Sequence, residues 1–184
     1  MQSGALSSIS AGGLATAAAV FQNSPAVAQG SYQTFTDTLA LTVFNNLPDN
    51  YGSYAADGID DDWQVQYFGL NNANAAPTVD PDHDGQNNLF EFTTGVVPND
   101  PNSRFLINAK NVTDQPTKKD IVFSPTFFDR TYSIQTSTTL LSGSWTTLSG
   151  GTTSNNGNVR TITDPNATGT RRFYRVQITK ILNP

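Results

Sequence analysis

The part of the chain after Arg104 alternates between apolar and polar residues in short runs, the pattern of half-buried β-strands. Turn clusters separate most of these runs, at Asp114–Lys119, Leu141–Ser144, Gly150–Gly157 and Asp164–Gly169. The predicted strands are Phe105–Ala109, Asp120–Phe123, Thr131–Thr136, Trp145–Leu148, Val159–Thr163 and Phe173–Thr179. Short strands at this spacing predict a mainly β fold, with a small antiparallel β-sandwich over residues 104–184.

A further alternating run lies at Tyr32–Phe44. Phe35, Leu39, Leu41 and Val43 fall on one face of it, and threonines fall on the other. The run predicts a strand with one buried face, within a segment of strand and loop over residues 32–50.

Two short helices are predicted between these β regions. Asp60–Phe68 carries acidic residues in its first turn, where they suit the positive end of the helix dipole, and Asp60 or Asp61 is a candidate cap. Asn88–Thr94 is the second helix, and a glycine follows each one.

The N-terminal segment, residues 1–31, contains no charged side chain and is rich in Ala, Gly and Ser. Ala26-Val27-Ala28 resembles a signal-peptide cleavage site, although the segment has no Lys or Arg before its apolar run. The apolar run is too short for a membrane span. Two interpretations stay open: a signal peptide, or an assembly segment that is retained and packed.

Composition narrows the chemistry. The absence of Cys excludes disulfides, thiolate metal sites and thiol catalysis. The only His is His83. A charged fraction of 14%, with Thr, Ser, Asn and Gly in place of charge, is typical of β-rich surface or secreted proteins.

Charge is divided unevenly along the chain. Residues 1–103 contain eleven acids and no Lys or Arg, whereas residues 104–184 contain ten bases and four acids. One explanation is a cation-binding segment beside a basic domain. Another is self-association, in which the acidic half of one subunit docks on the basic half of another. An acidic first half argues against a nucleic-acid partner.

The twelve residues from Asp80 to Glu91 follow the D-x-D-x-D-G-x-x-x-x-x-E pattern in full, which predicts a calcium-binding loop. Calcium takes six to eight oxygen ligands, and the alternating acids let carboxylates converge as the chain turns at Gly85. The predicted ligands are Asp80, Asp82, Asp84, the backbone carbonyl of Gln86, Asn88 and Glu91. His83 falls at a non-ligating position.

A degenerate copy of this loop lies upstream, with Gly58 aligned to Gly85. Ser53 and Ala55 replace the first two acids of the pattern, and Gln64 replaces the closing Glu. We therefore expect no independent calcium binding here. Asp57 and Asp61 are possible auxiliary ligands of a shared site, or helix-capping residues.

The segment from Asp57-Gly-Ile-Asp-Asp-Asp-Trp63 through the loop to Asn99-Asp-Pro-Asn-Ser103 resembles the calcium repeats of thrombospondin type 3-like and dockerin-like proteins. It is most similar to the version in secreted proteins of Verrucomicrobia and Planctomycetes. The runs Arg130-Thr-Tyr, Ser144-Trp and Phe173-Tyr-Arg-Val resemble the domain that often follows it. The resemblance implies secretion, rigidity that depends on calcium, and an immunoglobulin- or fibronectin-like sandwich.

The expected organisation is an uncharged segment over 1–31, a strand and loop over 32–50, a calcium segment over 51–103 and a sandwich over 104–184. The expected function is that of a secreted structural protein, a subunit of an extracellular filament, coat or adhesive surface, with calcium as a structural clamp. The alternative is a non-catalytic carbohydrate-binding module that uses exposed aromatic residues, with Trp145, Tyr132, Phe173 and Tyr174 as candidates. Catalysis is not expected, because calcium and helix capping account for the clustered acids.

Overall fold

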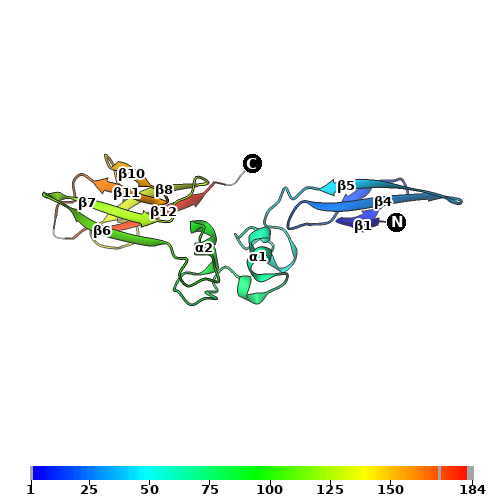
Figure 1. Cartoon of the computed structure of the whole chain (residues 1–184), viewed down its shortest axis with the longest axis horizontal. Helices are drawn as coiled ribbons and strands as arrows, with labels where there is room; N and C mark the ends of the chain where they lie inside the picture. Colours follow the sequence, from blue (N-terminus) through cyan, green and yellow to red (C-terminus); the bar gives the residue numbers. More distant parts are fainter. Residues whose placement is uncertain (1, 170, 182–184) are drawn as a thin grey trace. The chain divides into compact units, whose positions relative to one another are not determined.

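The computed structural model describes residues 2–169 and 171–181. Met1 of the predicted N-terminal segment, and Thr170 and residues 182–184 of the predicted sandwich, lie outside the described residues. The described chain is mainly antiparallel β-structure with two short α-helices, as the sequence predicted (Figure 1). It divides into two compact units, residues 1–81 and 82–184. This division falls inside the predicted calcium loop and does not coincide with the predicted start of the sandwich at residue 104.

The first unit begins with strands, so the uncharged segment is folded here. Its main sheet has the order β1-β4-β5, with β1 (Gln2–Gly4), β4 (Ser24–Tyr32) and β5 (Phe35–Val43). A separate pair joins β2 (Leu6–Ile9) and β3 (Ala15–Ala17). Ala26, Val27 and Ala28, the residues of the predicted cleavage site, lie within β4. No helix in the described ranges is long and apolar enough to cross a membrane.

The prediction for Tyr32–Phe44 was only partly right. Tyr32 ends β4, and a tight turn with Gln33 at φ 55° leads into β5. The predicted buried face is wrong at its start, because Phe35 is 74% and Leu39 60% exposed. The small core of this unit covers only the other end of the hairpin; its members are Ala5, Leu6, Val20 and Ala26, with Leu41 and Val43 packed against them.

Three short helical elements complete the first unit: the 3-10 helices η1 (Gly52–Tyr54) and η2 (Ala73–Ala75), and α1 (Asp61–Phe68). Tyr54 ties them together, because its hydroxyl donates to the Gly69 carbonyl at 2.7 Å and accepts from the Asn72 N–H at 2.6 Å. The predicted cap is not formed: the Asp60 side chain makes no capping hydrogen bond, and Asp61 is the first residue of the helix and accepts N–H groups from the preceding loop.

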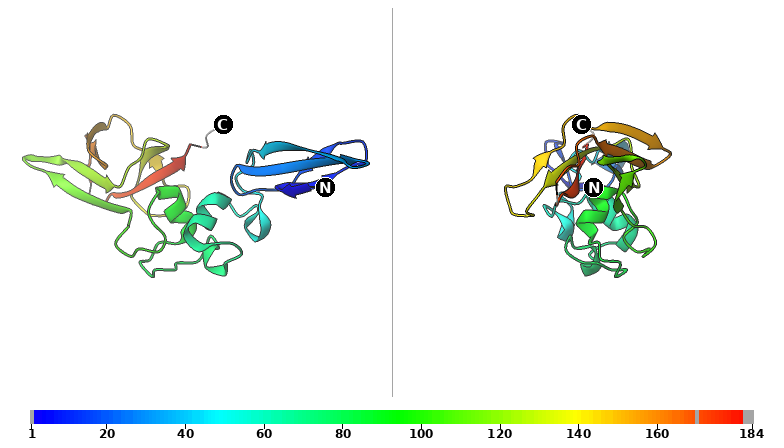
Figure 2. Two further views of the ribbon diagram at one scale, coloured as in Figure 1. Left: turned by 45° about the vertical axis from the view of Figure 1, so that its right-hand side comes forward. Right: turned by 90° about the vertical axis from the view of Figure 1, so that its left-hand side faces the viewer.

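The second unit is a sandwich of two antiparallel sheets. One sheet has the order β10-β11-β7-β6 and the other β12-β8-β9. Their strands carry the colours from green to red in Figure 2. If β6, β7 and β8 are strands A, B and C and the two-residue β9 is the extra strand C′, the four-stranded order is the D-E-B-A order of immunoglobulin-type domains. The strands are β6 (Leu106–Val112), β7 (Gln115–Ser124), β8 (Arg130–Ser137), β9 (Thr146–Thr147), β10 (Thr152–Asn156), β11 (Val159–Asp164) and β12 (Phe173–Lys180).

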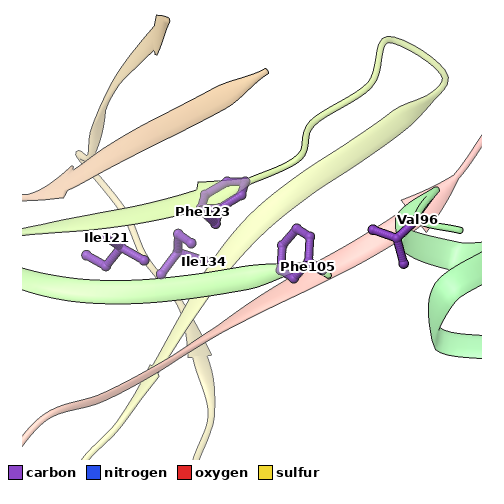
Figure 3. Close-up of a cluster of buried hydrophobic side chains, with 5 residues drawn as sticks. All are labelled: Val96, Phe105, Ile121, Phe123 and Ile134. Atoms are coloured by element: carbon purple, nitrogen blue, oxygen red, sulfur yellow. The ribbon is translucent and has the colours of Figure 1, made fainter. Parts of the chain in front are cut away.

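The sandwich core contains Phe105, Ile121, Phe123 and Ile134, which come from both sheets and the segment before β6 (Figure 3). Val96, which lies just after helix α2 (Asn88–Thr94), belongs to the same core and is 2% exposed. The end of the calcium segment is therefore part of the sandwich, which explains why residues 82–103 and 104–181 form one compact unit.

Two parts of the sandwich differ from the prediction. The polar run of β10 was assigned to a turn, but it pairs with β11 as an edge strand and all five of its residues are exposed. The first half of β7 was also assigned to a turn, and its residues are mostly exposed. Both runs lack the apolar alternation on which strand prediction depends, because neither has a fully buried face.

Candidate metal centre

Three carboxylates of the predicted loop converge. One oxygen from each of Asp80, Asp82 and Asp84 lies within 4.8 Å of the other two. The chain makes the turn with Gly85 at φ 93° and with His83, which is exposed, at φ 63°. The main chain folds back on the acids, because Asp82 accepts the Asp84 N–H at 3.2 Å.

Helix α2 begins directly after this turn. The Asn87 side chain caps it by accepting the Phe90 N–H at 3.0 Å. Asn88 and Glu91, both predicted ligands, lie on its first turn and are fully buried, at 0% exposure. Residues three apart lie on the same face of a helix, so the amide of Asn88 and the carboxylate of Glu91 share one face.

Gln86 has a second role that the sequence did not reveal. Its side chain donates to the Phe105 carbonyl at 3.1 Å and accepts the Phe105 N–H at 3.0 Å. Its own N–H donates to Asp84 at 2.7 Å. These bonds join the loop to the beginning of the sandwich. They use the side chain and the N–H of Gln86, and none of them uses its carbonyl, which is the predicted ligand.

Arg104 is a site residue that the sequence analysis missed. Its Nη2 donates to the Asp84 carbonyl at 2.9 Å, and its Nε lies 3.4 Å from Asp84 Oδ2, whose side chain is 1% exposed. The signal was available, because Arg104 is the first basic side chain after eleven acids. It offsets part of the negative charge of the loop.

The donor set suits a hard cation. The clustered atoms are carboxylate oxygens, and the neighbouring buried side chains on α2 carry amide and carboxylate oxygens. Oxygen-only sites suit calcium, magnesium or manganese, whereas zinc and copper favour nitrogen and sulfur ligands. The Asp80, Asp82 and Asp84 cluster can thus hold a metal ion of this class.

A helix begins at the same position of the pattern in the upstream copy as in the loop Asp80–Glu91. Helix α1 begins at Asp61 and α2 at Asn88, so the two helices are offset by the same spacing as Gly58 and Gly85. Both oxygens of Asp57 are engaged, one with the Ile59 N–H at 3.0 Å and one with Gln64 Nε2 at 2.8 Å. Asp61 uses Oδ2 to accept the N–H groups of Asn50 and Tyr51, at 2.7 and 2.9 Å.

The aromatic residues of the carbohydrate alternative are largely engaged within the sandwich. Tyr132 and Tyr174 pack against the core, and the Tyr174 hydroxyl donates to Asp164 at 2.9 Å. Trp145 is half-buried, and the Arg175 guanidinium lies 4.5 Å from its ring centroid. Phe173 is also partly buried.

No protein-family model, no curated protein and no solved structure matches this chain. The resemblance to thrombospondin type 3-like and dockerin-like repeats thus stays an expectation that depends on the motifs of the sequence.

Proposed function

We propose that this chain is a secreted, calcium-binding structural protein, a subunit of an extracellular filament, coat or adhesive surface. The observation that carries the proposal is the convergence of Asp80, Asp82 and Asp84 within 4.8 Å at the start of a loop with the full calcium pattern. The resemblance to calcium repeats of secreted proteins supports the location.

Calcium fits this loop better than magnesium does. Three aspartates, a main-chain carbonyl, Asn88 and a bidentate Glu91 would supply seven oxygens, within the six to eight that calcium takes. Magnesium favours six ligands in rigid octahedral geometry and retains several waters. Three close carboxylates repel one another without a cation, so binding would stabilise the loop.

Calcium would act as a clamp on the segment that joins the two units. The boundary between the units falls between Pro81 and Asp82, inside the loop. An ion bound by residues on both sides of that boundary restricts the backbone there. This is a structural role, in which the ion limits the motion of the connection.

Self-assembly is supported by an open strand edge in the first unit. Among the described residues β5 pairs with β4 alone. Exposed edges are usually protected by charge or proline, yet the only charge in β5 is Asp37, and Phe35 and Leu39 are exposed. The acidic first half and basic second half provide complementary charge for contacts between subunits.

Glu91→Gln tests calcium binding. The variant keeps the size of the side chain and removes one charge, and we expect calorimetric titration to show affinity for calcium reduced by at least about tenfold, or ~1.4 kcal/mol. Asp114→Asn, at an exposed turn outside the loop, is the matched control and should bind as the wild type does. Equal affinity in both variants would exclude the loop as the calcium site.

Assembly is tested by sedimentation and negative-stain imaging in calcium and in EDTA. Leu39→Lys places a charge on the exposed β5 edge and should prevent polymer formation, whereas Leu106→Lys, at a similarly exposed position of the sandwich (57%), should not. A wild-type chain that stays monomeric at all concentrations would refute the filament proposal. Glycan binding by that monomer, lost in Trp145→Ala, would favour the carbohydrate-binding alternative.

A further inference from the structure

The upstream copy and the residues just before it contain three buried oxygen atoms that no hydrogen-bond donor satisfies. They are Oδ1 of Asn50, Oδ1 of Asp61 and Oε1 of Gln64. Asp61 and Gln64 are both fully buried, at 0% exposure. Buried polar atoms in folded proteins are nearly always paired, so an unsatisfied group requires a missing partner such as a water or an ion.

The three residues are held together by contacts of the first unit. The N–H of Asn50 donates to Asp61 Oδ2 at 2.7 Å, which places Asn50 against the start of α1. Asp61 and Gln64 are three apart on the first turn of α1 and thus share one face. In the alignment that pairs Gly58 with Gly85, they correspond to Asn88 and Glu91, which are also at 0% exposure.

The side chains around Asp61 carry negative charge, and the first 103 residues supply no Lys or Arg to neutralise it. Asp61 has the carboxylates of Asp49 and Asp57 as electrostatic neighbours. Residues 1–103 contain no Lys or Arg, and a buried charge is ordinarily paired or bound to a metal.

A water molecule fits these atoms less well than a cation does. All three unsatisfied atoms are acceptors, and one water has only two hydrogens to donate. A hard cation takes six to eight oxygen ligands, so each of these oxygens can serve as a ligand, with waters to complete the shell. The Gln64 amide is oriented by its own bonds, because Nε2 donates to Asp57 at 2.8 Å and to the Ala75 carbonyl at 3.0 Å.

We propose that Asn50, Asp61 and Gln64 form a second calcium site, separate from the loop Asp80–Glu91. This site replaces the missing acids of the degenerate pattern with an asparagine that precedes the pattern. Asp57 acts indirectly, by orienting Gln64. The proposal departs from the expectation that the upstream copy binds no calcium by itself, and the experiment below decides between the two.

Asn50 is the residue to change, because no hydrogen bond of its side chain is seen among the described residues, whereas Asp61 also holds the main chain of Asn50 and Tyr51. Asn50→Ala removes one ligand and should weaken the second binding event by about tenfold or more in calorimetry. Asn46→Ala, at an exposed position of the same loop, is the control. Asn50→Asp adds a carboxylate and should tighten the same event.

The stoichiometry separates this proposal from the proposed function. Wild type should bind two calcium ions per chain, Glu91→Gln and Asn50→Ala should each lose or weaken a different one, and the double variant should affect both. A single ion that Glu91→Gln removes and Asn50→Ala leaves unchanged would overturn the second site while supporting the loop. Two binding events whose affinities are unchanged in both Asn50→Ala and Asn50→Asp would also overturn it. Thermal melts in EDTA verify that each variant folds.

Discussion

Arg130 should be the main support of helix α2, and its replacement gives the strongest test of how the calcium loop is joined to the sandwich. The side chain is 8% exposed. Its Nε donates to the Thr93 carbonyl at 2.7 Å and its Nη2 to the Phe92 carbonyl at 2.9 Å. Both acceptors lie in the last turn of α2, where carbonyls have no partner within the helix and the dipole favours a cation.

The expected loss follows from these contacts. A hydrogen bond with a charged partner contributes about 1.5–3 kcal/mol, so the two bonds to α2 give a gross value of roughly 3–6 kcal/mol. The variant also loses the Nη1 bond to Asp129 at 2.6 Å, which is partly exposed to water. Water regains part of the hydrogen bonding at the helix end in a variant, so we expect a net loss of about 2–3 kcal/mol for Arg130→Met. For a domain near one hundred residues this lowers the melting temperature by roughly 10–20 °C. Arg130→Lys should lose about half as much, because an ammonium lacks the planar fork that reaches both carbonyls.

The assay is thermal unfolding followed by tryptophan fluorescence. The chain has two tryptophans, so a Trp63→Phe background leaves Trp145 as the only reporter, and it lies in the second unit. Arg171→Met, at an exposed position, controls for loss of one positive charge. Because α2 also carries Glu91, Arg130→Met should weaken calcium binding by the loop as well. If Arg130→Met and Arg171→Met melt at the same temperature, the guanidinium does not hold α2 in place.

Two further changes test local features of the sandwich unit. Gly95→Ala should lower the free energy of unfolding by about 2 kcal/mol or more, since φ is 82° and a Cβ would lie 2.8 Å from Phe127 Cε2. The control Gly143→Ala, at φ 80° with open space around it, should lower it by only about 1 kcal/mol. Equal losses for the two variants in urea unfolding would contradict the clash at Gly95. Burial and the hydrogen bond to Asp164 raise the pKa of Tyr174 from 10.0 to about 12. The folded state therefore holds the phenol proton longer than the unfolded state, so stability should fall by roughly 1–2 kcal/mol as the pH rises from 10 to 12; the same unfolding assay on Tyr174→Phe should lack that slope, and an identical slope would rule the assignment out.

Local patterns were the best predictors of structure. The spacing of Asp80, Asp82, Asp84 and Gly85 depends only on how consecutive residues turn, so the convergence of the three carboxylates followed from the sequence. Helix α2 was predicted with its observed bounds, Asn88–Thr94, because capping and the terminal glycine act within a few residues.

Burial was harder to predict than element type. Phe35 and Leu39 show the same alternation as Leu41 and Val43, yet only the latter pair packs on the core of the first unit. Alternation shows which residues share a face, and it carries no information about how far the covering layer extends. The edge strand β10 was not predicted, because all of its residues are exposed and an exposed strand needs no apolar residues to reveal it.

The sequence by itself determined the β-rich class, the convergence of the acids at Asp80–Asp84 and the two helices, because each depends on interactions between residues close together in the chain. Only the tertiary structure joined Arg130 to α2, Gln86 to Phe105 and Arg104 to Asp84, and only it left buried oxygens on Asn50, Asp61 and Gln64 without donors. Most of these contacts link positions that are distant in the sequence. Which distant groups meet depends on how the whole chain packs, and a pattern of neighbouring residues does not encode that packing.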